Sequence, residues 1–164
     1  MVFSAEVLAL AQSVLDACRA RGWQLATAES CTGGLVAAAL TAIAGASDVV
    51  ERGFVVYSNE AKSELLGVPP ATIAAHGAVS AETAAAMAQG AILRAPADFA
   101  ISVTGIAGPG GGGREKPVGL VFLGLAGHDG RCRTERHVFA GDRTAVREAA
   151  LRSALALLAA AAGG

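Results

Sequence analysis

One turn, rich in glycine and polar side chains, lies between a predicted strand and a predicted helix and constrains the fold more than any other segment. The turn spans residues 28–34, follows the short strand predicted at 23–27, and precedes a helix that begins at Leu35. A strand that leads directly into a helix places such a turn at the carboxyl end of a sheet, beside unpaired helix N–H groups that can hold an anion. Catalytic serines of open α/β sheets favour this position. The hydroxyls of Ser30 and Thr32 therefore have two interpretations, a role in chemistry or capping of the helix.

Predicted strands and helices alternate along the rest of the sequence. Helices are expected at 5–20, 35–43, 59–66, 81–94 and from Asp142 onward, and strands at 53–57, at 99–103 and in a hairpin of 118–126 with 133–139. This order predicts an α/β fold, a three-layer α/β/α arrangement on a mixed, mostly parallel sheet, with residues 1–164 forming a single domain. Because crossover helices would cover both faces, the largely apolar strand 53–57 is expected to be buried on both sides.

The first three predicted strands should bring their carboxyl ends to one edge of this sheet. Ser30, Tyr57 and Thr104 stand at those ends, so we expect their side chains to lie near one another. Lys62 follows about one turn into the helix that Ser58 opens. A lysine buried beside an apolar sheet edge has a lowered pKa, and a Ser–Lys pair can then act without a histidine. The alternative is that Lys62 is an ordinary exposed helix residue.

Composition excludes several classes of protein. The chain has 164 residues, is 53% hydrophobic and carries a net charge of −1. It therefore lacks the excess of basic residues that is typical of nucleic-acid-binding proteins. No uncharged apolar run reaches the roughly 18 residues that span a bilayer. The first ten residues contain no Lys or Arg, unlike a signal peptide, and the three cysteines lack the spacing of a zinc site or a disulfide framework. We therefore expect a cytoplasmic protein without a metal, a membrane or a nucleic-acid partner.

A glycine-rich loop follows the predicted strand 99–103. Residues 108–113 match the pattern G-x-G-x-x-G, but the residues after them, from Pro117 to Phe122, favour a strand where a dinucleotide-binding motif requires a helix. A phosphate-binding P-loop is excluded as well, because Arg114 stands where that motif has lysine. The loop can either bring N–H groups to an anion or carbonyl, or simply be flexible.

Several other residues are weaker candidates. Among the histidines only His76 lies near a helix start that could face the site, and no G-x-S-x-G elbow surrounds Ser30. Cys31 is an alternative nucleophile, although small buried cysteines are usually part of a core. Arg143 and Arg147 lie four residues apart on one predicted helix face and could clamp a phosphate or be plain surface charges.

Five blocks of sequence, in order, closely resemble the CinA C-terminal domain family. The blocks are residues 28–34, 53–62 with 65–68, 77–80, 102–113 with 116–119, and 141–147. The resemblance runs from about residue 5 to residue 160. The sequence is similar to the stand-alone members of the family, which are nicotinamide-nucleotide amidohydrolases. The family fold is a three-layer α/β/α arrangement with a mixed five-stranded sheet, as the order of elements also predicts.

The resemblance implies an enzyme that hydrolyses the carboxamide of nicotinamide mononucleotide (NMN) to nicotinate mononucleotide and ammonia, for NAD recycling. Carried over to this sequence, it assigns the nucleophile to Ser30, the base to Lys62 and an assisting hydroxyl to Tyr57. It implies no metal or other cofactor, and a homo-oligomer, namely a dimer. Val56 is a departure, because the family commonly has threonine there, and this should alter packing more than chemistry.

The same resemblance implies a set of substrate-binding residues. The backbone around Thr32, Gly33 and Gly34 would contact the oxyanion or the substrate, Thr104 and Gly105 would line the pocket, and Arg143 or Arg147 would bind the phosphate. Glu29 is expected either to position the turn or to contact the ribose hydroxyls. Two other functions stay open: a nucleotide-binding module without activity, and hydrolysis of a different amide by the same mechanism.

Overall fold

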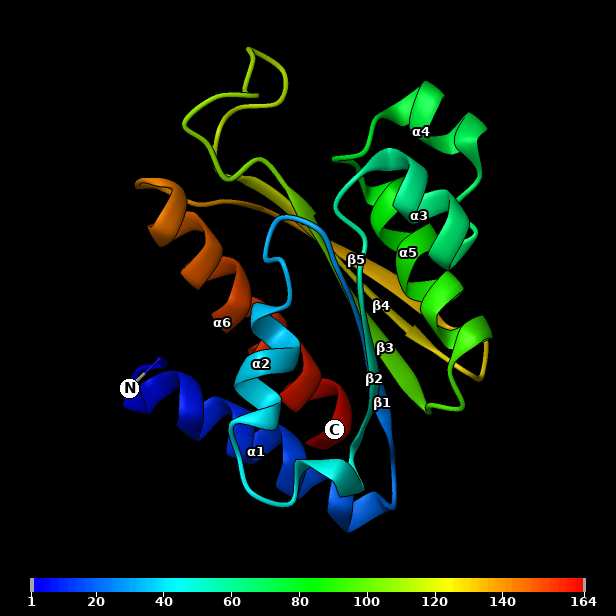
Figure 1. Ribbon diagram of the computed structural model, residues 1–164, viewed down its shortest axis with the longest axis vertical. Helices are drawn as coiled ribbons and strands as arrows, with labels where there is room; N and C mark the ends of the chain where they lie inside the picture. Colours follow the sequence, from blue (N-terminus) through cyan, green and yellow to red (C-terminus); the bar gives the residue numbers. More distant parts are fainter. Residues whose placement is uncertain (1, 164) are drawn as a thin grey trace.

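The computed structural model describes residues 2–163 and contains one five-stranded sheet between two layers of helices (Figure 1). The strands are β1 (Leu25–Glu29), β2 (Val50–Val55), β3 (Phe99–Gly105), β4 (Leu120–Gly127) and β5 (Cys132–Val138), in the spatial order β2-β1-β3-β4-β5. β2, β1 and β3 are parallel, while β4 is antiparallel to both of its neighbours. Because β4 alone is reversed, the sheet is mixed and mostly parallel, and the predicted fold class is confirmed.

The helices divide between the two faces of the sheet. α1 (Ala5–Arg21), α2 (Leu35–Thr41) and α6 (Arg143–Gly163) cover one face, and α3 (Asn59–Leu66), α4 (Pro70–His76) and α5 (Ala81–Arg94) cover the other (Figure 1). A short 3-10 turn, Ala46–Asp48, precedes β2. Among the helices of residues 2–163, none is both long enough and apolar enough to cross a membrane.

The two faces of the sheet are packed differently. Toward α1, α2 and α6 the sheet presents large side chains such as Ile101 and Leu123, which belong to the larger core. Toward α5 it presents small residues, including Ala28 and Ala100, so that this helix lies close to the strands. A Cβ atom at Gly124 of β4 would lie 2.4 Å from the Ala84 carbonyl oxygen of α5, so only glycine fits there. The alternation of large and small side chains along each strand thus sets the spacing of the layers.

Most predicted elements are confirmed, and capping residues explain why. α3 and α5 have the predicted bounds because Ser58 and Ser80 accept hydrogen bonds from the backbone N–H three residues on. β1 lies two residues later than predicted, so it ends directly at Ser30.

The prediction for the second strand is wrong in two respects. β2 spans Val50–Val55 and lies at the edge of the sheet, where Val55 is 52% exposed, rather than being covered on both faces. The apolar run of the sequence continues past the strand into Val56, which is buried between the sheet and α3. Tyr57 therefore lies in the loop between β2 and α3.

Candidate active site

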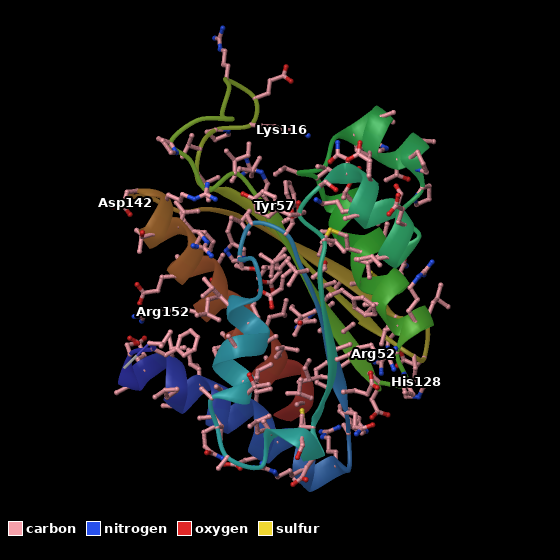
Figure 2. All side chains as sticks on the ribbon, in the orientation of Figure 1. Arg52, Tyr57, Lys116, His128, Asp142 and Arg152 are labelled. Carbon is pink, nitrogen blue, oxygen red and sulfur yellow. The ribbon has the colours of Figure 1, made fainter. Side chains whose placement is uncertain are left out.

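A pocket of about 260 Å³ lies at the carboxyl ends of β1 and β3. Its lining includes Ser30, Tyr57 and Thr104, which the topology of the first three strands predicted to converge, and Lys62 from the helix that follows the second strand. Figure 2 shows Tyr57 at the end of the sheet between the glycine-rich loop and α3, while His128 lies at the opposite end. A larger cavity of about 590 Å³ lies at that opposite end and is lined in part by Cys132, whose thiol has a pKa raised by burial.

Ser30 and Lys62 form the chemical centre of the pocket. The distance between Lys62 Nζ and Ser30 Oγ is 2.9 Å, and the two residues are only 1% (Lys62) and 7% (Ser30) exposed. Lys62 extends from the buried face of α3, the helix that Ser58 caps. The alternative of an exposed Lys62 is therefore wrong.

Two backbone carbonyls hold the amine of Lys62 in place. Nζ donates to the carbonyl oxygens of Val56, at 3.0 Å, and Tyr57, at 3.1 Å, while the carbonyl oxygen of Ser58 is more distant, at 3.5 Å. A neutral amine has two N–H donors and one lone pair. With both donors on these carbonyls, the lone pair is left for the hydroxyl of Ser30.

Burial makes the neutral form of Lys62 accessible. It lowers the pKa of the amine, an effect only partly opposed by the nearby Cys31 and Glu60. A lysine with a lowered pKa can accept the serine proton at neutral pH and return it later. The pair can therefore act as nucleophile and general base.

Cys31 does not share these properties. It is 7% exposed, and its pKa is raised to about 11, chiefly by burial. The thiolate, which is the nucleophilic form, is therefore scarce at neutral pH. This favours Ser30 over the adjacent thiol.

Glu29, the residue before Ser30, caps α2. The carboxylate is fully buried and accepts hydrogen bonds from the backbone N–H groups of Gly34 (3.0 Å), Val36 (3.1 Å) and Ala37 (2.9 Å). The hydroxyl-capping alternative is thus wrong for both Ser30, which contacts Lys62, and Thr32, whose Oγ1 has no hydrogen-bond partner among the described residues. Glu29 therefore contacts the start of α2 and does not line the pocket.

The two glycines of the turn serve its backbone geometry. Gly33 and Gly34 have φ angles of +61° and +101°, which other residues rarely adopt. Their N–H groups already donate to the Ser30 carbonyl, at 3.0 Å, and to Glu29. The N–H groups of Cys31 and Thr32 have no backbone or side-chain acceptor in another residue among residues 2–163, so the turn leaves these two donors available.

The two arginines of α6 make different contacts. Arg143 lines the pocket and donates to the Tyr57 hydroxyl oxygen, at 3.0 Å, and to the Gly108 carbonyl, at 2.9 Å. Arg147 does not line the pocket; it donates to the carbonyls of Cys31, at 3.1 Å, and Thr32, at 3.0 Å. Of the two phosphate candidates, Arg143 is therefore the one at the pocket.

Thr104 and Gly105 lie in the pocket lining, as expected. The Thr104 hydroxyl donates to the Ala78 carbonyl at 2.7 Å and ties β3 to the segment before α5. A Cβ at Gly105 would lie 2.8 Å from the Leu120 carbonyl oxygen, so close packing of β4 explains this glycine.

The glycine-rich loop forms part of the pocket rim. Gly108, Gly110 and Gly111 line it, and the strand β4 follows, as the sequence predicted against a dinucleotide-binding motif. Lys116 Nζ donates to the carbonyl of His76 at 2.5 Å, which ties the loop to the end of α4 (Figure 2). The His76 side chain lies 3.5 Å from Glu82 and is outside the pocket lining.

Sequence reasoning missed several lining residues. Asn59, the first residue of α3, is one, and Ala78, Val79 and Ile106 are others. Asn59 had a signal, since it follows Tyr57 closely at the predicted edge. The three apolar residues lie within the blocks 77–80 and 102–113 that carry the family resemblance, but no role was predicted for them. Within the described part of the chain, no group of three or more His, Cys, Asp or Glu side chains could hold a metal ion.

The fold and the site define a three-layer α/β/α protein with a buried Ser–Lys pair at the carboxyl ends of its parallel strands. The family model of the CinA C-terminal domain matches residues 7–162. The chain belongs to this family, which confirms the resemblance of the sequence blocks.

Curated relatives and solved structures agree with this assignment. The chain is 52% identical to "Nicotinamide-nucleotide amidohydrolase PncC" of Escherichia coli K12 over 153 residues, which cover 93% of each chain. It is 56% identical to the protein of the same name from Enterobacter agglomerans over 131 residues, or 80% of each chain. The crystal structure of competence/damage inducible protein CihA from Agrobacterium tumefaciens has a TM-score of 0.95, with 48% identity and 98% of each chain covered.

Proposed function

We propose that this protein is a nicotinamide-nucleotide amidohydrolase that converts NMN to nicotinate mononucleotide and ammonia, and so serves NAD recycling. The observation that carries the mechanism is the 2.9 Å contact between Ser30 and the buried amine of Lys62. The substrate rests on the names of the relatives that are 52–56% identical to this chain.

The first half of the reaction forms an acyl-enzyme. Ser30 Oγ attacks the carboxamide carbon while neutral Lys62 takes its proton, giving a tetrahedral intermediate. Lys62 then returns that proton to the amide nitrogen, so that the C–N bond breaks and ammonia leaves. The N–H of Thr32 is our candidate to stabilise the oxyanion.

Water completes the reaction. Lys62 takes a proton from water, the hydroxide oxygen attacks the ester carbon, and Ser30 leaves with the proton that Lys62 returns. Tyr57 and Arg143, joined by their hydrogen bond, are proposed to bind the substrate at the rim, with the Arg143 guanidinium on the 5′-phosphate.

Ammonia release from a panel of NMN, nicotinamide riboside, nicotinamide and NAD tests the function. We expect the highest kcat/KM with NMN. Turnover of another amide alone would identify a different substrate, and binding of NMN without any turnover would identify a nucleotide-binding module. The location in the cytoplasm and the homodimer implied by the family resemblance also stay proposals, the latter open to light scattering in solution.

A further inference from the structure

We propose that Glu29 and Arg147 are positioning residues, which hold the backbone of the Ser30 turn from two sides. The inference rests on the proposed Ser–Lys mechanism. Neither side chain lines the pocket, yet both bind the backbone of residues 31–37 directly.

Glu29 holds the N–H side of the turn. Its carboxylate has no cationic partner among the described residues and is compensated by three backbone N–H groups in the first turn of α2. A buried carboxylate without a cation is costly, and an exposed Ser or Asp would cap a helix without that cost. Because Glu29 is adjacent to Ser30, its three hydrogen bonds also fix where the nucleophile leaves β1.

Arg147 holds the C=O side. The two parallel donors of its guanidinium bind the consecutive carbonyls of Cys31 and Thr32. In a planar trans peptide, C=O and N–H point in opposite directions. The bond to the Cys31 carbonyl therefore also sets the direction of the Thr32 N–H, the amide that we assign to the oxyanion.

Together with a contact from β3, these side chains hold the turn on both sides of Ser30. Ser30 N–H donates to the Val103 carbonyl at 2.9 Å, so β3 holds the start of the turn while Arg147 and Glu29 hold its remainder. A displacement of about 1 Å in a reacting group can cost on the order of 100-fold in rate. Loss of either side chain should therefore lower kcat while leaving substrate binding intact.

The first test replaces Arg147. We expect Arg147→Met to lower kcat about 10- to 100-fold with KM for NMN within about twofold, since the contacts act on the nucleophile and not on the substrate. Arg147→Lys keeps a cationic donor and should recover part of kcat. The matched control is Arg152→Met, because Arg152 lies on the same helix but binds Glu148 and Glu6. A rise in KM at unchanged kcat would make Arg147 a substrate ligand and overturn the proposal, as would unchanged kinetics.

The second test replaces Glu29 by glutamine. The side chain keeps its shape, but an amide NH₂ donor takes the place of one carboxylate oxygen and faces the backbone N–H groups of α2. We expect kcat to fall at least tenfold at a temperature where circular dichroism shows the variant folded. A lower melting temperature with unchanged kcat would show that Glu29 only caps α2 and does not position Ser30, which would overturn its proposed role. Should Glu29→Gln fail to fold, the Arg147→Lys and Arg147→Met pair still decides the positioning of the turn.

A fluorophosphonate that labels active serines separates this inference from the proposed function. Labelling of Ser30 needs the aligned nucleophile but no NMN, so the Arg147→Met protein should react at least tenfold more slowly than wild type. If wild type labels but does not hydrolyse NMN, the substrate assignment fails and the positioning role stands. If wild type and Arg147→Met label at equal rates, the positioning role fails.

Discussion

Replacement of Lys62 by methionine, which has a similar length and no charge, tests the buried amine through the stability of the protein. Burial lowers the pKa of Lys62 from 10.5, so over a range of pH the unfolded chain holds a proton that the folded protein has released. In that range the free energy of unfolding rises with pH, by at most about 1.4 kcal/mol per pH unit for one group. The rise begins at the lowered pKa of the folded state and ends near 10.5. Lys62→Met should lack it.

Urea unfolding of wild type and Lys62→Met between about pH 6 and pH 9 measures this difference. The upper limit avoids the buried thiols Cys18 and Cys31, whose pKa values are raised from 9.0 to about 11 and whose effect on stability has the opposite sign. The stability of wild type minus that of the variant should grow with pH. A difference that falls with pH would mean that the folded protein favours the charged lysine, and would refute the reasoning.

The same variant should be nearly inactive. General bases contribute about 10²–10⁴ in rate, and a nucleophile with its base up to about 10⁶, so we expect a loss of kcat/KM of at least about 10³, or about 4 kcal/mol. The acidic limb of the wild-type kcat/KM profile should report a pKa well below 10.5. Full activity of Lys62→Met would exclude the amine as the base.

Three further results are expected. Activity should survive EDTA, because the proposed Ser30–Lys62 mechanism requires no metal and no group of three or more His, Cys, Asp or Glu side chains among residues 2–163 could hold one; loss on chelation that zinc or magnesium restores would overturn the serine mechanism. Arg143→Ala should mainly raise KM for NMN, by a factor equivalent to about 1.5–3 kcal/mol. The ratio of kcat/KM for NMN to kcat/KM for nicotinamide riboside should fall; an unchanged ratio would show that Arg143 does not bind the phosphate. Cys31→Ser should lower kcat less than about tenfold, since the protonated thiol does not attack, and a dead variant that still folds would contradict this.

The sequence predicted those parts of the molecule that depend on local pattern. Ser58 and Ser80 are N-caps with helical residues after them, so α3 and α5 could be placed to the residue. The convergence of Ser30, Tyr57 and Thr104 followed from topology, because the parallel strands end at one edge.

Long-range contacts could not be predicted in this way. The guanidinium of Arg147 reaches carbonyls 115 and 116 residues away, and no periodicity in the sequence marks such a pair. The end of β2 was misplaced because Val56 is as apolar as the strand before it, although it packs against α3. Its role toward Lys62 uses only its backbone carbonyl, which any residue at this position supplies.

The activity of Ser30→Ala, Lys62→Ala and the double variant tests the central claim most directly. Each single change should lower kcat for NMN by several orders of magnitude, and the double variant should lose little more, because nucleophile and base act as one unit. Losses that multiply in the double variant, or a Ser30→Ala protein that still releases ammonia at a rate near that of wild type, would contradict a Ser30–Lys62 mechanism.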